Sequence, residues 1–508
     1  MMQTENSRIN RRGMLGLLLG GVAQAGMARG ALAQDLIASP LPKPRPADLY
    51  LQSIPTGEAL IEASGLSGEV SYVVADSLSG AIHESHVPLL RLPPASVAKT
   101  VTALYALEHL GADYRFATRV LRSGPVVDGI VQGDLILAGG GDPTLDTDGL
   151  AVLAGQLVEQ GIKGVSGRFL IDDTALPRIE EIDAGQTDYA GYNPTISGLN
   201  LNYNRVHFEW KKQGEGYSLK MDARAERYAP DVRIARISVA ARNLPVFDHV
   251  AGQGRDEWTV AQSALGNGGA RWLPVRLPGL YAGEVFQSVA GAQGLRLPQG
   301  QRMAASGEEI ARIESAPMSV VVRDMLKYST NLTAEVLGLT ASRARGLTVG
   351  SLQASASAMS DWARGALNMR HISFVDHSGL GGASEVTTVD LAHMLVVPGV
   401  EARLAPLLKS FPMKDGQGGV IANHPLSVVA KTGTLNFVST LAGYVDAPGG
   451  KRMAFAIFVA DVPRREAAQA QGAEIPQGAR TFNGRAKRLQ QALIERWGAL
   501  APAGAFPG

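Results

Sequence analysis

The chain has 508 residues, with 48 Lys and Arg against 47 Asp and Glu, and it contains no cysteine. The lack of cysteine excludes disulfides, a cysteine nucleophile, and thiolate sites for zinc or iron–sulfur clusters. The formal net charge of +1 argues against a nucleic-acid-binding protein, which usually carries a basic excess. With 45% apolar residues, the chain is able to bury sizeable cores.

Residues 1–33 have the pattern of a secretory signal. A basic start at Ser7–Arg12 precedes an uncharged stretch, Met14–Met27, and the small residues of Ala31–Ala33 suit a signal peptidase. We therefore expect cleavage before Gln34 and an exported, periplasmic protein. Arg11-Arg12 resembles a twin-arginine export signal, and a Sec signal is the alternative. Because no apolar run is long enough to span a bilayer, we expect at most weak membrane association.

The first elements expected after this segment are a strand and a helix. Gly68–Asp76 alternates and is rich in β-branched residues, which predicts a strand. Pro93-Pro94 then opens a helix with an apolar face, and Gly111 ends it. From about 115 to 305, short β-like runs alternate with Gly and Asp turns and predict a mostly β region: Val131–Leu137, Gly167–Asp172, Tyr217–Met221 and Ile234–Val239.

Helical patterns return after residue 305. Ser319–Leu339 and Leu347–Leu367 are the longest. Two predicted strands follow at 427–430 and 437–445, and a turn at 447–450 leads into a third at 452–460. One apolar stripe predicts a C-terminal helix packed on the core: Phe482, Ala486, Leu489, Leu493 and Trp497.

The first motif with chemical meaning is Ser96-Val97-Ala98-Lys99 at the predicted helix start. Positions i and i+3 share a helix face, so the lysine amine is expected beside the serine hydroxyl. A neutral amine there could take the hydroxyl proton and make Ser96 a nucleophile. Alone, this spacing is also common on ordinary solvated helices.

Two further motifs follow. Ser329-Thr330-Asn331 lies between helical stretches, where such a triplet often only caps a helix. Lys431-Thr432-Gly433 ends a predicted strand, where it would present a cation and a hydroxyl to a cleft. The glycine would let substrate backbone approach closely.

Together and in this order, the Ser-x-x-Lys, Ser-x-Asn and Lys-Thr-Gly motifs are typical of class A β-lactamases and penicillin-binding proteins. Their flanks narrow the match. The chain resembles the serine-type D-alanyl-D-alanine carboxypeptidases/endopeptidases, the class C low-molecular-mass penicillin-binding proteins, over about residues 50 to 497. The segments that carry the resemblance are Pro93–Thr100, Gly139–Leu145, Tyr328–Glu335, Asp376–Leu380 and Lys431–Leu435.

The resemblance implies an α/β (α+β) architecture, namely the penicillin-binding-protein/β-lactamase-like transpeptidase fold. Its antiparallel sheet is flanked by helices, with inserted, mostly β domains. The long interval between Ser96 and Ser329 fits such an insert. We therefore expect a discontinuous catalytic domain at 34–114 and 305–500, interrupted by a β-rich region at 115–304 that forms two modules.

The resemblance also implies roles for the motif residues. Ser96 would be the nucleophile, Lys99 its base and Ser329 a proton relay, while Asn331 would hold the peptide amide and Lys99. Lys431, Thr432, Gly433 and Thr434 would receive the terminal carboxylate, and the backbone N–H groups of Ser96 and Thr434 would form an oxyanion hole. A like charge from Lys431 is expected to keep Lys99 neutral.

Asp188 is a further candidate, as a partner for a free amine on the peptide. Two departures from the family pattern concern substrate positioning: Thr330 replaces a usual Asp, and His377 replaces a usual Gly after Asp376.

The function predicted from these residues is hydrolysis of D-Ala-D-Ala termini or D-Ala cross-links of peptidoglycan through a serine acyl-enzyme. The expected partners are stem peptides as substrates and β-lactams as inhibitors, with no cofactor, no metal and no nucleic acid, and the oligomeric state stays open. A β-lactamase and a slow penicillin-sensing or wall-binding protein are the alternatives.

Overall fold

The computed structural model describes residues 49–252, 254–470, 474–504 and 506. The predicted signal segment lies outside the described residues. The chain divides into the units 1–50 and 51–508, and the second unit holds every element below except the start of α1 (Leu49–Gln52). Within the described part of the chain, no helix is both long and apolar enough to cross a membrane.

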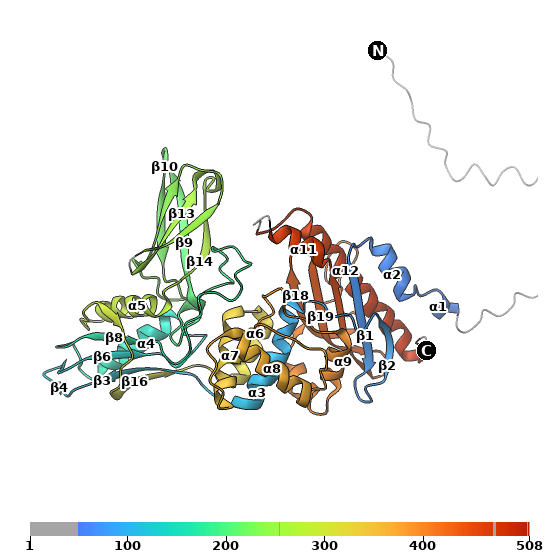
Figure 1. The fold of residues 1–508 in the computed structure, drawn as a ribbon, viewed down its shortest axis with the longest axis horizontal. Helices are drawn as coiled ribbons and strands as arrows, with labels where there is room; N and C mark the ends of the chain where they lie inside the picture. The colour runs from blue at the N-terminus through green and yellow to red at the C-terminus, as the bar shows by residue number, and fades with distance from the viewer. Residues whose placement is uncertain (1–48, 253, 471–473, 505, 507–508) are drawn as a thin grey trace, which may run out of the picture. The chain divides into compact units, whose positions relative to one another are not determined.

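A six-stranded antiparallel sheet lies on the right of Figure 1. Its order is β17 (Lys409–Ser410), β18 (Ser427–Leu435), β19 (Val438–Ala447), β20 (Lys451–Ala460), β1 (Glu69–Asp76) and β2 (Ile82–His86). The central strand β20 is buried on both faces. Its successive side chains point to opposite sides of the sheet and enter two different cores. Phe455, Ile457 and Val459 face one core, and Ala454, Ala456 and Phe458 face another.

Helices cover both faces of this sheet. On one side, α12 (Ala479–Leu500) packs its predicted stripe against β19, and α2 (Gly57–Ser64) packs against α12. On the other side lie α9 (Thr388–Val396), α10 (Val400–Leu404) and η4 (Ala405–Leu407). The remaining short elements of this region are α11 (Val462–Gln469) and η5 (Ala501–Ala503).

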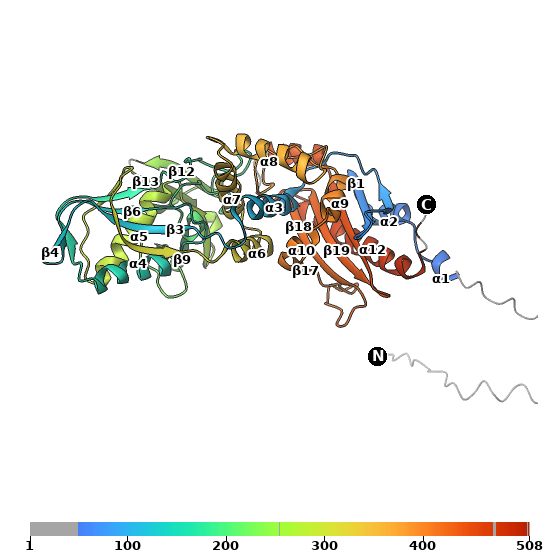
Figure 2. The ribbon, with the colours of Figure 1, turned by 90° about the horizontal axis from the view of Figure 1, so that it is seen from below.

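A cluster of helices lies next to the same sheet (Figures 1 and 2). Its centre is η1 (Ala95–Val97) continued by α3 (Ala98–Leu110), which packs against α6 (Met318–Tyr328), α7 (Asn331–Ala344) and α8 (Leu352–Ala366). The helix predicted over 319–339 is broken at Ser329, which has φ 59° in the left-handed region. The next helix begins at Leu352, later than predicted, because the Ser351 side chain caps it.

The segment after α3 begins a five-stranded mixed sheet. Its order is β15 (Gly300–Arg302), β8 (Phe169–Asp172), β6 (Leu135–Ala138), β3 (Ala117–Arg122) and β16 (Glu308–Glu314), with α4 (Thr147–Glu159) and α5 (Pro278–Ala292) packed on it. Neither helix was predicted. The strand predicted over Val131–Leu137 is also wrong as one element, because Gly133 (φ 148°) divides it. Its first part, β5 (Ile130–Val131), joins a small sheet with β4 (Val126–Val127) and β7 (Gly164–Val165).

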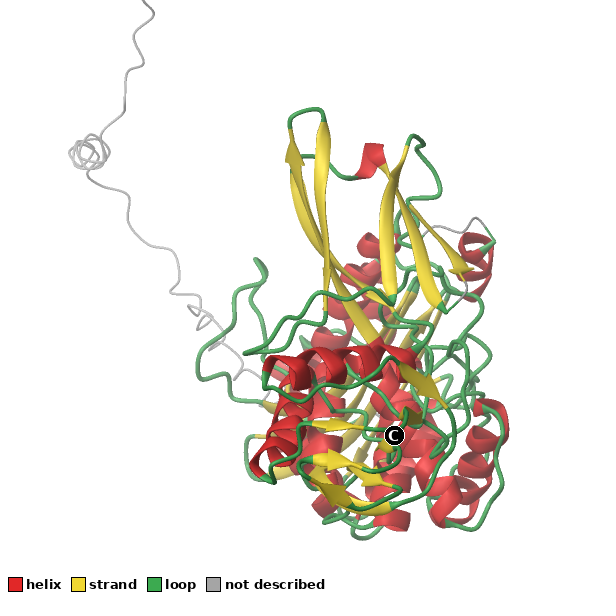
Figure 3. Ribbon diagram, turned by 90° about the vertical axis from the view of Figure 1, so that its left-hand side faces the viewer, coloured by secondary structure: helices red, strands yellow, loops and turns green. Residues whose placement is uncertain are grey.

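Two three-stranded sheets form a further module that stands above the five-stranded sheet in Figure 1 and is seen from the side in Figure 3. One sheet holds β10 (Gly216–Asp222), β9 (Arg205–Gln213) and β14 (Gly268–Pro274), and the other holds β11 (Ala235–Ala240), β13 (Arg255–Ala261) and β12 (Phe247–Gly252). The turn η2 (Asn202–Asn204) leads into β9, and η3 (Gln262–Ala264) connects β13 to β14. Phe208, Phe247 and Trp258 share one core.

The division into a catalytic domain and an insert stays a prediction. The strand pairing favours a later end for the insert than residue 304, since β16 (Glu308–Glu314) pairs with β3 throughout its length.

Candidate active site

The start of α3 places the first motif. Ser96 is half-buried in η1, and Lys99 follows on the same face, fully buried, with its Nζ 3.0 Å from Ser96 Oγ. Ala95, directly before the serine, has φ 46°. An alanine in this left-handed region is strained by about 1 kcal/mol or more, as is common beside functional groups. The i,i+3 spacing thus brings the amine and the hydroxyl together as predicted.

Lys99 Nζ has three polar neighbours. Besides Ser96 Oγ, it donates to Asn331 Oδ1 at 2.8 Å and to the Ser378 carbonyl at 2.8 Å. These two oxygens can only accept. A neutral amine has two hydrogens and one lone pair, so both hydrogens are committed and the lone pair faces the hydroxyl of Ser96. This is the arrangement that a general base requires.

Burial, and not Lys431, controls the ionisation of Lys99. Complete desolvation lowers the pKa of Lys99 to about 8, while the nearby Glu335 and Asp376 carboxylates act in the opposite direction. The expected cause, repulsion by Lys431, is not the one found. Instead, burial first and then the charge of Lys99 lower the pKa of Lys431 well below its ordinary value.

The second motif joins the first at the break between α6 and α7. Ser329 occupies the left-handed end of α6, and Asn331 opens α7. Lys431 Nζ donates to Ser329 Oγ at 3.0 Å and to the Thr432 carbonyl at 2.7 Å. Asn331 Nδ2 donates to the Tyr192 carbonyl of the inserted region at 2.9 Å.

The third motif lies on β18, next to η1. Thr432 and Thr434 are exposed, whereas Lys431 before them and Gly433 between them are buried. A Cβ on Gly433 would lie 2.9 Å from Ala95 Cβ and 2.9 Å from the Pro94 carbonyl oxygen. Glycine is therefore required here for the segment that holds the nucleophile to approach the strand, and not only for the approach of a substrate.

The first two motifs, together with Thr434 directly after the third, border a cleft of about 330 Å³ whose lining includes Ser96, Ser329 and Asn331. A larger adjoining cavity of about 590 Å³ shares Tyr192, Gln186, Asn436, Arg465 and Glu474 with it. Both volumes are in the range of small-ligand sites.

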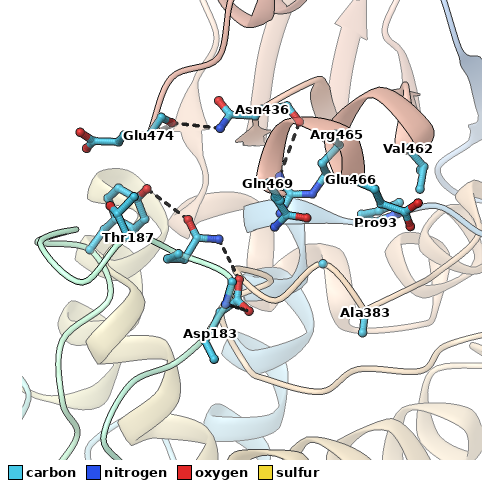
Figure 4. A pocket seen from close by; sticks show the side chains of 15 residues that line it. Pro93, Asp183, Thr187, Ala383, Asn436, Val462, Arg465, Glu466, Gln469 and Glu474 are labelled. Carbon is cyan, nitrogen blue, oxygen red and sulfur yellow. Dashed lines mark hydrogen bonds between the residues drawn. The ribbon is translucent and has the colours of Figure 1, made fainter. Parts of the chain in front are cut away.

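The loop between β8 and η2 contributes one wall of this adjoining cavity (Figure 4). Asp183 and Thr187 lie on this loop, opposite Arg465, Glu466 and Gln469 of α11. The two sides are joined where Arg271 pairs with Glu474 at 2.8 Å.

Sequence reasoning missed several of these groups. Arg465 is buried, and its Nη2 has no hydrogen-bond partner among the described residues. No sequence signal pointed to it. Asp188 is exposed and is not among the residues that line either cavity, and its carbonyl accepts from Arg276 Nη2. Asp183, on the same loop, lines the cavity instead. The role given to Asp188 thus stays a prediction without support from its position.

No group of three or more metal-ligating side chains occurs among the residues that the structure describes.

The sequence is similar to those of known proteins. The model of the D-Ala-D-Ala carboxypeptidase 3 (S13) family matches residues 58–478. A D-alanyl-D-alanine carboxypeptidase of Actinomadura sp. (strain R39) is 28% identical over 478 residues, which cover 84% of this chain and 86% of that protein. D-alanyl-D-alanine carboxypeptidase DacB of Haemophilus influenzae is 26% identical over 398 residues, covering 72% and 80%.

The fold also has solved counterparts. The crystal structure of penicillin binding protein 4 (dacB) from Haemophilus influenzae matches with a TM-score of 0.70 at 20% identity, over 87% of this chain and 99% of that one. The same protein complexed with a β-lactam matches with a TM-score of 0.66 at 19% identity, over 87% and 99%. The predicted fold class, a mixed α and β architecture with an antiparallel sheet flanked by helices, is confirmed.

Proposed function

The chain belongs to the D-Ala-D-Ala carboxypeptidase 3 (S13) family, and we propose that it hydrolyses D-Ala-D-Ala termini and D-Ala cross-links of peptidoglycan peptides through an acyl-enzyme on Ser96. The predicted family and the prediction of a serine peptidase are confirmed by this membership. The observation that carries the mechanism is the contact between Lys99 Nζ and Ser96 Oγ at 3.0 Å, with both amine hydrogens held elsewhere.

In the proposed acylation, Ser96 Oγ bonds to the carbonyl carbon while its proton moves to Lys99 Nζ. The carbonyl electron pair moves onto oxygen, where the backbone N–H groups of Ser96 and Thr434 would stabilise it. Removing one such donor typically costs about 10²–10³ in rate. The geometry supports this assignment because Ser96 and Thr434 line the same cleft.

Collapse of this intermediate breaks the carbon–nitrogen bond. Ser329 gives its proton to the leaving amine and regains one from the protonated Lys99, which leaves Lys99 neutral again. Water then attacks the ester with Lys99 as base, and Ser96 recovers its hydrogen. Lys431, which hydrogen bonds to Ser329, would with Thr432 and Thr434 receive the terminal carboxylate of the peptide.

We further propose that β-lactams acylate Ser96 and that the chain acts after export, with its signal cleaved before Gln34. A β-lactam complex of penicillin binding protein 4 from Haemophilus influenzae, whose fold this chain shares, supports the first point. The basic and apolar pattern of residues 1–33 supports the second.

The test is incubation of the mature protein with cross-linked muropeptides and, separately, with a chromogenic β-lactam. We expect muropeptide turnover, slow β-lactam release and a covalent β-lactam adduct on Ser96 by intact mass, with S96A as the control. Rapid β-lactam hydrolysis alone would replace the proposal with a β-lactamase. An adduct without turnover of either compound would indicate a sensing or wall-binding protein.

A further inference from the structure

Glu335 is a buried carboxylate for which the proposed chemistry has no role. It lies on α7, one turn after Asn331, and its side chain has no exposure to solvent. Its two oxygens accept the backbone N–H groups of consecutive residues, with Oε2 bound by His377 at 2.9 Å and Oε1 by Ser378 at 2.9 Å. The carboxylate therefore fixes the orientation of two successive peptide units.

The peptide unit that follows these two, between Ser378 and Gly379, contacts the base directly. The N–H of Ser378 is held by Glu335, and the carbonyl of Ser378 accepts from Lys99 Nζ at 2.8 Å. The position of the amine thus depends on a backbone segment that the carboxylate holds in place. Glu335 reaches Lys99 through one residue and makes no direct hydrogen bond to it among the contacts of the described residues.

Other contacts hold the same segment. Asp376 accepts the N–H groups of Gly379 at 2.7 Å and Gly381 at 2.6 Å. Thr102, which lies on α3 three residues after Lys99, donates its hydroxyl to the His377 carbonyl at 2.6 Å. The segment is therefore anchored both to α7 and to the helix that carries Ser96 and Lys99.

General stability does not explain this carboxylate well. Burying a charge costs free energy that its hydrogen bonds at best offset, so buried ionised groups are weak sources of stability. Burial and the neighbouring Asp376 raise the pKa of Glu335, whereas the two backbone hydrogen bonds and the charge of Lys99 lower it. What the carboxylate provides is geometry, because it can accept two adjacent N–H groups at once.

We propose that Glu335 is the positioning residue for the Lys99 base: it clamps the His377–Ser378 backbone and so sets the Ser378 carbonyl that orients the amine toward Ser96. This inference rests on the proposed role of Lys99. Helix α7 would then have two functions one turn apart. Asn331 accepts one amine hydrogen of Lys99 directly, and Glu335 holds the residue whose carbonyl accepts the other.

The test compares saturation kinetics of acylation by a fluorescent penicillin in full mature protein. Three variants are measured, and for each the limiting rate constant and the half-saturating concentration are determined. E335Q keeps the shape but turns an amide N–H toward a backbone N–H, so one clamp bond is lost. T102V loosens the same segment without a change of charge.

The matched control is D390N. Asp390 is also buried, and its oxygens accept the N–H groups of the consecutive residues Arg370 at 3.1 Å and His371 at 2.6 Å. In the described part of the chain, the hydrogen bonds of Asp390 go to residues other than Lys99 and Ser96. D390N therefore reproduces the loss of a buried two-amide clamp without reaching the base.

We expect E335Q to lower the limiting acylation rate constant about 10- to 100-fold, as for a small misplacement of a reacting group, with the half-saturating concentration within about twofold. T102V should act in the same direction by a smaller factor. D390N should lose thermal stability yet keep its limiting rate.

Two results would overturn the inference: folded E335Q acylating within about twofold of wild type, or an equal loss of rate in D390N. If E335Q does not fold, T102V is the test variant. A wild-type limiting acylation rate constant in T102V would then contradict the inference. Wild type that forms no adduct on Ser96 would instead reject the proposed function, so the two failures are distinguishable.

Discussion

In the proposed mechanism, acylation of Ser96 requires the neutral form of Lys99, so we expect the acylation rate to depend on pH in a defined direction. Complete burial lowers the pKa of Lys99 to about 8. Lys99 acts as a base only after losing its proton. The acylation rate should therefore rise about tenfold per pH unit below this pKa and level off above it.

The magnitude follows from the fraction of neutral amine. At pH 7, a group with a pKa of about 8 is neutral in roughly one molecule in ten. An exposed lysine with a pKa of ~10.4 would be neutral in roughly one molecule in 2,500. Burial thus raises the population of active base about 200-fold at neutral pH, a factor that the carboxylates of Glu335 and Asp376 keep from being larger.

The assay is rapid mixing with a fluorescent penicillin between about pH 5.5 and 9.5, followed by acid quench and measurement of labelled protein. Circular dichroism at each pH checks that the protein stays folded. K99R is the matched variant, because a guanidinium keeps the positive charge but cannot be deprotonated in this range. We expect no acylation of K99R at any pH. A wild-type rate independent of pH, or labelled K99R, would refute the assignment of Lys99 as base.

Three further changes test the packing and chemistry around the site. Gly433→Ala would place a Cβ 2.1 Å from Thr440 Oγ1, and we expect a loss of about 1–3 kcal/mol in the free energy of unfolding by urea; unchanged stability would contradict the close packing. Glu84→Ala would leave the buried Arg496 guanidinium, 3.1 Å from the Glu84 carboxylate, without its acidic partner. Thermal denaturation should then show a loss of about 3–5 kcal/mol in the free energy of unfolding. A loss below about 1 kcal/mol would argue against this ion pair. Ser329→Ala should slow muropeptide cleavage about 10²–10⁴-fold in a chromatographic assay, and normal turnover would exclude the proton relay.

Strong periodicity made much of the fold predictable from the sequence. The helix after Pro93-Pro94, the strand at 69–76 and the C-terminal stripe ending at Trp497 are all present. The missed helix α4 also had a signal, because Asp146 caps it and Leu150 lies on its buried face. Its neighbouring Gly and Asp turns favoured the β interpretation instead.

The break at Ser329 could not be predicted, because its cause is tertiary. A serine between two helical patterns does not by itself require φ 59°. In the fold, Lys431 Nζ, which lies on a strand 102 residues further along, donates to the Ser329 hydroxyl. Local propensity contains no information about such a partner, so the sequence placed the motif between helical stretches without indicating the left-handed conformation of Ser329.

The motif residues could be identified from the sequence, but the groups that hold them could not. Ser96, Lys99 and Lys431 stood out because their spacing has a chemical meaning. Tyr192 takes part through its carbonyl, which every residue possesses, and Glu335 through a contact with backbone N–H groups. Contributions of this kind leave no recognisable side-chain pattern, so only the folded chain reveals them.

The state of Lys99 follows from how its acceptors are distributed along the chain. Asn331 and Ser378 lie 232 and 279 residues beyond Lys99, and Asn331 is itself bound to the inserted region through Tyr192. A partly folded chain that has formed α3 alone has Ser96 beside Lys99 but neither acceptor, and its amine is exposed and protonated. Burial and both acceptors arrive only when the sheet, the helices and the insert have come together. Reactivity of Ser96 toward a β-lactam should therefore appear with the completed fold and not with the local helix that carries the nucleophile.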